Sequence, residues 1–216
     1  MWTASFASNM NFPAPLAVMA FLTACLGFFG SMAAAAIFWF ARKPKFARVT
    51  FIAAGTGAAI YLAVLFGFSA ASRTITLTSG QEKYFCEIDC HLAYSVTDVQ
   101  TQPAGDRTRY LVTLRTRFDE TTTSSSRPRD ASLTPSPREM FLVDSFGRQF
   151  GPESMRGTPP STPLKPAESY ITQLEFVVPK EAPGLKLLLN TIPGWPDRVV
   201  IGDENSWLHK KTYFAL

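Results

Sequence analysis

The first 41 residues contain no charged side chain, and neither does the stretch from Val49 to Ser72. These absences leave two long apolar runs, Leu16–Ala41 and Val49–Ala71, which also lack histidine. About 20 consecutive apolar residues are needed to cross the hydrocarbon core of a bilayer, and both runs meet that requirement. The sequence therefore predicts two transmembrane helices, at about residues 16–41 and 49–71.

The missing ionisable residues also bear on what the helices do. An ion or proton path normally leaves a costly ionisable side chain inside the membrane, so a pump or transporter is disfavoured. Assembly of several hairpins into a channel is disfavoured for the same reason. We expect the helices to anchor the chain in the lipid bilayer, and small residues four apart, such as Gly27/Ser31 and Ala53/Gly57, to let them pack on each other.

The connection between the two runs is strongly basic. Residues 42–48 hold four Lys or Arg and no acid. Positive charge of this kind marks the cytoplasmic side of a membrane protein. We therefore predict a bacterial inner (cell) membrane protein whose loop 42–48 is cytoplasmic, with the N-terminus and everything after about Ser72 extracytoplasmic.

A cleavable signal peptide is the alternative for the first run. Such a peptide has a positive n-region and an apolar core of roughly 7–15 residues. Here the lead is uncharged, the apolar run is longer, and the positive cluster follows it. We favour a retained helix.

Neither charge nor composition points to nucleic acid. The net charge of +4 equals the charge of the basic loop, so the remainder is nearly neutral. A nucleic-acid-binding domain shows a basic patch of its own. We predict no nucleic-acid partner.

After the helices the sequence predicts an all-β sandwich, with domains at 1–73 and 74–216. Short runs of alternating apolar and polar residues, separated by Pro, Gly and Ser, are typical of that fold. The predicted strands are Thr74–Ser79, Tyr84–Val96, Arg109–Phe118, Glu139–Val143, Arg148–Phe150, Ser169–Val178, Leu185–Leu189, Arg198–Ile201 and Lys211–Leu216. Thr121–Pro137 is too polar and proline-bearing for a strand, and is predicted to be a mobile connection.

The order of several short motifs resembles a known family. They are Gly80-Gln81, Arg109–Leu114, Phe141–Phe150 with its Asp144-Ser145-Phe146-Gly147-Arg148 turn, Leu164–Glu168 and Phe176–Pro179. This succession is similar to bacterial extracytoplasmic immunoglobulin-like domains of the secreted-immunoprotective-antigen type, often found behind a membrane anchor. The resemblance implies an immunoglobulin-like sandwich with a binding or structural role. Ala167 stands where that family usually has Gly.

The one segment with pointed chemistry is Phe85–His91, which holds Cys86, Cys90 and His91. An oxidising exterior favours a Cys86–Cys90 disulfide. In a continuous strand the two Cα atoms would be about 13 Å apart, whereas a disulfide needs them within roughly 7 Å. The pair closes only if the intervening residues turn.

Three other interpretations of this segment stay open. Cys86, Cys90 and His91 would ligate copper or zinc, with His209, Met140 or Met155 as a fourth ligand. A covalent haem is a further alternative, although Cys-x-x-x-Cys-His is one residue longer than the usual attachment motif. The cysteines would otherwise be small core residues, with His91 exposed on the strand.

No catalytic constellation stands out, so we predict that the protein is not an enzyme. With two histidines in the chain, a nucleophilic triad is a poor candidate. Arg115 and Arg117 are expected on a solvated strand face, the alternative being contact with an anionic surface. The leading function is a membrane-anchored binding or structural module, whose partner is another envelope protein or a second copy. The alternative is a metal or redox protein, with copper or zinc at Cys86, Cys90 and His91.

Overall fold

The computed structural model describes residues 7–86, 90–124, 127–128 and 130–216. Its contacts divide the chain into two compact units. Unit 1 comprises Met1–Asn9, Arg73–Pro193 and Lys211–Leu216, and unit 2 comprises Met10–Ser72 and Gly194–Lys210. Each unit is described by itself.

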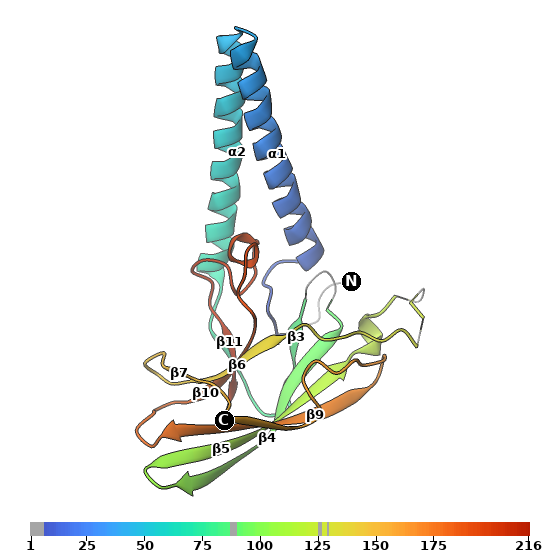
Figure 1. Ribbon diagram of the computed structural model, residues 1–216, viewed down its shortest axis with the longest axis vertical. Helices are drawn as coiled ribbons and strands as arrows, with labels where there is room; N and C mark the ends of the chain where they lie inside the picture. The colour runs from blue at the N-terminus through green and yellow to red at the C-terminus, as the bar shows by residue number, and fades with distance from the viewer. Residues whose placement is uncertain (1–6, 87–89, 125–126, 129) are drawn as a thin grey trace. The chain divides into compact units, whose positions relative to one another are not determined.

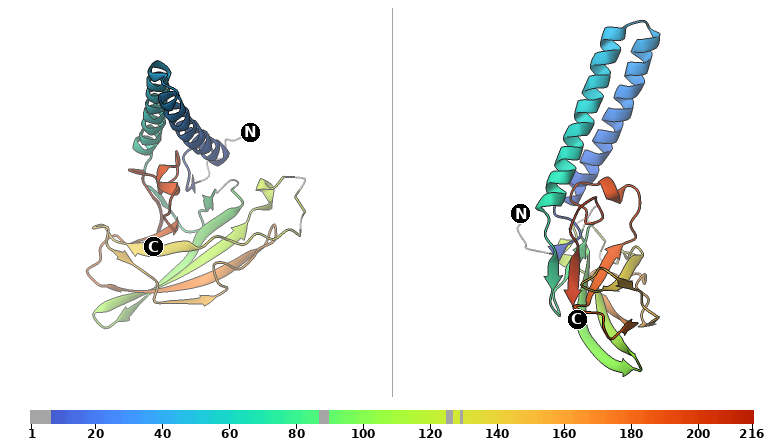
Figure 2. Two further views of the ribbon diagram at one scale, coloured as in Figure 1. Left: turned by 45° about the horizontal axis from the view of Figure 1, so that its top comes forward. Right: turned by 90° about the vertical axis from the view of Figure 1, so that its left-hand side faces the viewer.

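Unit 2 is built on an antiparallel pair of helices, α1 (Ala14–Phe40) and α2 (Pro44–Ala71) (Figure 1). Pro15 and Pro44 lie in the first turns, where a missing N–H costs no hydrogen bond. Both helices are long and apolar enough to cross a membrane, as predicted by their composition. The turn end of the hairpin is the tighter end, and Figure 2 (left) shows the helices diverging away from it.

The turn between the helices is shorter than the predicted loop 42–48. Backbone N–H groups of Arg42 and Lys43 donate to the carbonyls of Trp39 and Phe38, at 3.0 and 2.9 Å. Arg42 adopts φ 59°, so the helix ends in a Schellman motif. Because α2 begins at Pro44, Lys45 and Arg48 project from its first turns.

The buried small residues of α1 and α2 include alanines but none of the predicted glycines. Ala17, Ala35, Ala47 and Ala54 are buried. At Gly27, Gly30, Gly55 and Gly57, an added Cβ would meet no described atom within 4 Å beyond the helix's own backbone. The prediction that these glycines allow close approach of the helices is therefore wrong, although the antiparallel pairing is confirmed.

The second part of unit 2 is the segment Gly194–Lys210, which the sequence predicted to hold a strand at Arg198–Ile201. That prediction is wrong, because the chain forms the short 3-10 helix η2 (Asp197–Val199) and a turn. Val199 and Ile201 bury their side chains against Leu65 of α2, together with partly buried aromatic residues of the hairpin. Their hydrophobicity therefore serves a contact with a helix rather than with a sheet.

Unit 1 is a sandwich of two sheets (Figures 1 and 2). The first has the order β1-β3-β4-β5-β9-β8 and the second the order β2-β11-β10-β6-β7. The strands are β1 (Ala7–Ser8), β2 (Ile75–Leu77), β3 (Lys83–Phe85), β4 (Leu92–Ala104), β5 (Arg107–Phe118), β6 (Arg138–Val143), β7 (Gln149–Phe150), β8 (Ser154–Gly157), β9 (Ser169–Pro179), β10 (Lys186–Thr191) and β11 (Thr212–Ala215).

The alternation read from the sequence accounts for the core. Inward positions of both sheets form one buried cluster, which includes Tyr94, Leu114, Leu142, Phe176 and Leu187. The β4–β5 ladder runs from Leu92↔Phe118 to Ala104↔Arg107, with a bulge between Val96 and Asp98. The sandwich architecture is therefore confirmed.

Two segments fall in a different unit from the one that a boundary at residues 73/74 implies. Ala7 and Ser8 precede α1, yet they pair in parallel with Lys83 and Tyr84 of β3. Residues 194–210 lie between β10 and β11, yet they group with the helices. The helical hairpin is thus inserted in the sequence between β1 of one sheet and β2 of the other.

Candidate functional site

The chain reverses direction between Cys86 and Cys90. Phe85 of β3 pairs antiparallel with Leu92 of β4, so the predicted continuous strand Tyr84–Val96 is wrong. The alternation of apolar and polar residues gives no signal for this reversal, because two short antiparallel strands show the same alternation as one long strand. Residues 87–89 lie outside the described part of the chain.

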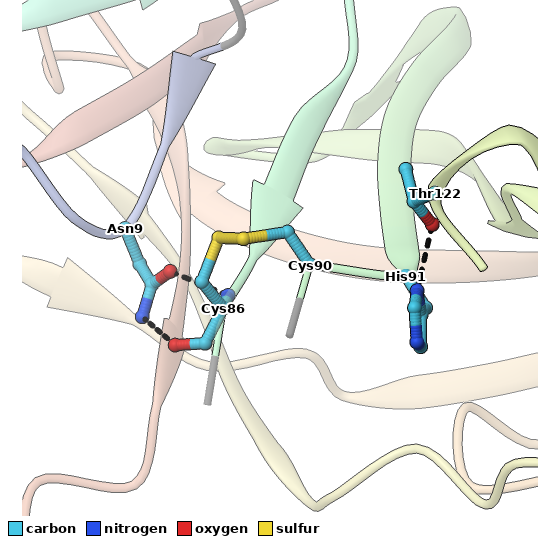
Figure 3. Close-up of a disulfide and its surroundings, with 5 residues drawn as sticks. All are labelled: Asn9, Cys86, Cys90, His91 and Thr122. Atoms are coloured by element: carbon cyan, nitrogen blue, oxygen red, sulfur yellow. Dashed lines mark hydrogen bonds between the residues drawn. A yellow bond between two sulfur atoms is a disulfide. The ribbon is translucent and has the colours of Figure 1, made fainter. Parts of the chain in front are cut away.

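The reversal brings the two cysteines together. Their Cα atoms are 4.2 Å apart and their Sγ atoms 2.05 Å apart, which is a disulfide (Figure 3). The sequence required residues 87–89 to turn for this pairing, and those residues lie outside the described part of the chain. A disulfide leaves neither sulfur as a thiolate, which is the form that binds a metal.

The Asn9 side chain forms hydrogen bonds with the backbone of Cys86. Its Oδ1 accepts the Cys86 N–H at 2.8 Å, and its Nδ2 donates to the Cys86 carbonyl at 3.4 Å (Figure 3). The Asn9 backbone N–H also donates to the Tyr84 carbonyl at 3.1 Å. The buried Asn9 side chain thus continues the β1–β3 ladder by imitating a strand backbone.

His91 is 6% exposed, which rules out the exposed strand position that one interpretation gave it. Its ring stacks on Phe118 with centroids 5.5 Å apart, and its Nδ1 lies 2.7 Å from Thr122 Oγ1. The Thr122 hydroxyl donates its only proton to the Asp119 carbonyl, so Nδ1 carries the hydrogen of the His91–Thr122 bond. In Figure 3 the imidazole lies beside Thr122, apart from the two sulfur atoms.

The other proposed metal ligands have separate places. Met140 is buried in the sandwich core, Met155 is exposed on β8, and His209 belongs to unit 2 with its Nδ1 2.7 Å from the Lys210 carbonyl oxygen. Within the residues that the structure describes, no three or more His, Cys, Asp or Glu side chains are grouped to hold a metal ion. The metal alternative stays a prediction, and free-thiol and metal analysis of purified protein tests it.

A charged network lies next to His91 and was not foreseen. Arg117 on β5 donates from Nε and Nη2 to the two carboxylate oxygens of Glu82, at 2.8 and 2.7 Å. The same Nη2 lies 3.2 Å from Asp119 Oδ2. Arg117 is therefore an ion-pairing residue instead of part of a solvated basic face, whereas Arg115 is exposed as predicted.

Tyr84 and Asp119 complete this network. The Tyr84 hydroxyl donates to Asp119 Oδ2 at 2.5 Å, and the Thr121 N–H and hydroxyl donate to Oδ1. Burial alone would raise the pKa of Asp119, but the hydrogen bonds from Tyr84, Thr121 and Arg117 outweigh it and lower that pKa to about 2. The hydrogen bonds from Arg117 also lower the pKa of Glu82, while burial and the bond to Asp119 raise the pKa of Tyr84.

Lys83 is a second residue that the sequence did not single out. Its side chain is 0% exposed, and its Nζ donates to the carbonyls of Leu189 on β10 and Thr212 on β11, at 2.6 and 3.4 Å. Nζ also lies 4.7 Å from the centre of the Phe85 ring. Because β3 belongs to one sheet and β10 and β11 to the other, Lys83 links the two layers.

A polar clamp lies at one end of β3, β4 and β5, and it consists of Asn9, Glu82, Tyr84, the Cys86–Cys90 disulfide, His91, Arg117 and Asp119. It joins the segment before α1, the cysteine loop and the start of the 121–137 connection by hydrogen bonds. Each charged member of the clamp has a partner of opposite charge or a hydrogen-bonding hydroxyl.

Fold and site together define a protein with two long apolar helices and a two-sheet sandwich. No family model matches the chain, and no curated protein matches it. The resemblance to the secreted-immunoprotective-antigen type therefore stays a prediction.

Among solved structures, the sandwich is similar to an uncharacterized beta-sandwich protein from Clostridium difficile 630. That match has a TM-score of 0.39 and 8% sequence identity, and it covers 67% of this chain and 95% of the other. A similarity at this level supports no conclusion about the fold or the function of this chain.

Proposed function

We propose that the protein is a non-catalytic binding or structural module of the bacterial envelope, anchored by its helical hairpin. In this proposal α1 and α2 cross the inner membrane, the basic turn is cytoplasmic, and an immunoglobulin-like sandwich lies on the extracytoplasmic side. The partner is another envelope protein or a second copy of the chain.

The pairing of Cys86 with Cys90 is the observation that best supports this assignment. Disulfides persist in oxidising compartments and are rare in the cytosol. Four basic residues cluster at the turn of the hairpin, and the cysteines follow the hairpin in the chain. Two independent kinds of chemistry, charge and redox, thus favour the same orientation.

Sheet edges and the 121–137 connection are the contact surfaces that we propose for the partner. Strand β8 is an edge of the first sheet and is only four residues long. Arg156 projects from it and its guanidinium is 3.5 Å from Glu175, while Met155 beside it is exposed. Exposed edges pair readily with an added strand, so β8 is a suitable place for a partner to dock.

Site-specific photo-crosslinking of the full-length protein in cells tests this proposal. A photoreactive residue at Arg156 is expected to give discrete adducts with one protein or with a second copy. The same residue at Leu174, which is buried on the neighbouring strand β9, is the matched control and is expected to give none. Monomer alone at Arg156 and at positions along the 121–137 connection contradicts a binding role.

A further inference from the structure

Unit 2 contains an apolar surface that the anchoring function does not use. The segment Gly194–Lys210, here called the 194–210 segment, exposes Trp195 (74%), Trp207 (45%) and Leu208 (74%). Exposed single hydrophobic residues are ordinary, but two tryptophans and a leucine within 14 residues are not. Tryptophan is the residue enriched where a protein meets the boundary between lipid and water.

The 194–210 segment is fastened to the hairpin by specific contacts. The Tyr61 hydroxyl of α2 donates to the Val199 carbonyl at 2.7 Å, and Trp207 stacks on Phe66 with an interplanar angle of 15°. Val199 and Ile201 share a buried apolar cluster with Leu65. The segment therefore lies along the helices in unit 2.

Helix geometry sets the depth of these contacts. Tyr61 follows Arg48 by 13 residues and Phe66 follows it by 18, which are about 20 and 27 Å at 1.5 Å per residue. The hydrocarbon core of a bilayer is about 30 Å thick, and tilting a helix shortens these heights further. With Arg48 at the cytoplasmic boundary, both contacts fall within the outer half of that core.

From this depth we propose that the 194–210 segment is a lipid-contacting element, in which Trp195, Trp207 and Leu208 face the outer leaflet. The inference rests on the proposed membrane anchoring of α1 and α2. Lipid is the occupant because Trp195, Trp207 and Leu208 are exposed and apolar, and because the contacts that fasten the segment lie at hydrocarbon depth. In this placement Arg198, which is also exposed, extends its long side chain toward the headgroup region. Lys210 is exposed beside Ser72, where α2 ends, and can reach lipid phosphates.

One further observation fits a lipid neighbour. A cavity of about 500 Å³ between the helices is bordered by Trp195 and Val199 as well as by Phe21, Gly57 and Tyr61, and its apolar lining suits an acyl chain better than water.

Single-tryptophan variants of the full-length protein test the proposal in liposomes. The Trp195 reporter carries Trp2→Phe, Trp39→Phe and Trp207→Phe, and the Trp39 reporter keeps only the tryptophan near the basic turn. Phospholipids brominated on their acyl chains quench tryptophan on contact. We expect bromolipid to quench Trp195 and Trp39 alike, with little further loss from aqueous acrylamide.

The two reporters separate the two proposals. If Trp39 is quenched by bromolipid but Trp195 is quenched only by acrylamide, the 194–210 segment faces water and the inference is wrong. If bromolipid quenches Trp39 but neither quencher reaches Trp195, protein covers the 194–210 segment. That result also contradicts the proposal that this segment contacts lipid. If bromolipid fails to quench Trp39, the membrane anchoring itself is wrong.

Discussion

At the scale of single residues, Asp119 is a buried carboxyl group whose pKa is lowered by its hydrogen bonds in the fold. It accepts hydrogen bonds from Tyr84, Thr121 and Arg117, so its pKa falls from 3.8 to about 2. A carboxyl with a lowered pKa stabilises the native state fully above its unfolded pKa, and that stability disappears as pH falls through the folded pKa. The relevant window is therefore about pH 4 to 2.

We expect Asp119→Asn to lose stability at neutral pH and to flatten the acid limb of the unfolding curve. The expected loss at pH 7 is on the order of 1–2 kcal/mol, after allowing for solvent screening of the partly exposed Arg117. The measurement is chemical unfolding of the detergent-solubilised protein between pH 7 and pH 2. Parallel pH dependence in the variant and the unaltered protein would show that Asp119 is not the titrating group.

Ala167 illustrates a residue placed against its own backbone preference. It has φ 71°, in the left-handed region where glycine is favoured, and its N–H donates to the Phe118 carbonyl at 3.1 Å. The glycine expected from the family resemblance would suit this turn.

We predict that Ala167→Gly stabilises the sandwich by about 0.5–1 kcal/mol, because relief of the positive-φ strain exceeds the added entropy of the unfolded chain. Ala104→Gly in strand β4 is the control, and should destabilise by a similar amount. The midpoints of urea unfolding compare the two. Destabilisation by both changes would contradict a strained Ala167.

Lys83 and Arg117 show why the sequence alone did not predict the buried hydrogen bonds and ion pairs of single residues. Lys83 stands just before the predicted strand Tyr84–Val96, and Arg117 lies on the predicted strand Arg109–Phe118. Charged side chains at such positions are normally solvent-facing, and nothing in the local pattern distinguishes these two. Their partners Leu189, Thr212 and Glu82 lie far away in sequence or across a turn. Only the sheet topology brings the charges and their acceptors together.

At the scale of elements, the Cys86–Cys90 disulfide covalently links the end of β3 to the segment just before β4. The disulfide closes a loop of five residues, and the chain-entropy model gives about 2 kcal/mol for a loop of that size. Asn9 adds two side-chain hydrogen bonds to the backbone of Cys86. The loop therefore also holds the strand that leads into α1.

Replacing both cysteines, Cys86→Ser with Cys90→Ser, should lower the free energy of unfolding by about 2 kcal/mol. Thiol titration of the unaltered, denatured protein should detect Cys25 alone, and two further thiols after reduction. Cys25→Ala is the matched control and should leave the disulfide-dependent stability unchanged. Three thiols before reduction, or copper or zinc bound in stoichiometric amount, would favour the thiol or metal interpretation instead.

The strands show where periodicity succeeds and where it fails. Runs with a buried face, such as Arg109–Phe118 and Ser169–Val178, were predicted nearly to their ends because alternation reports burial. Strand β8 and the outer half of β4 are exposed and polar, so they carry no such signal. Val199–Ile201 gave a false signal because hydrophobic residues that meet a helix resemble a short strand.

At the scale of the whole molecule, the absence of charge and the basic turn were enough to predict the hairpin. The sequence could not show that the chain passes through β1 before α1, because a two-residue strand has no pattern. Nor could it show that 194–210 returns to the helices. Because of both features, the helical hairpin is inserted within the sequence of the sandwich instead of preceding it as a separate segment.

The connections at both ends of the hairpin are short in sequence. The chain runs directly from Asn9 to Met10 and α1, and from α2 through Ser72 to β2.

Orientation in the membrane is the central claim, and labelling of single cysteines measures it most directly. In a background of Cys25→Ala, Cys86→Ser and Cys90→Ser, one cysteine is added at one of two positions. The first is Phe146, which is 76% exposed in the turn after β6, and the second is Ala41, beside the basic turn. A membrane-impermeant maleimide applied to intact spheroplasts should label Phe146→Cys at once and Ala41→Cys only after lysis. Labelling of Ala41→Cys in intact spheroplasts, with Phe146→Cys protected until lysis, would contradict the account.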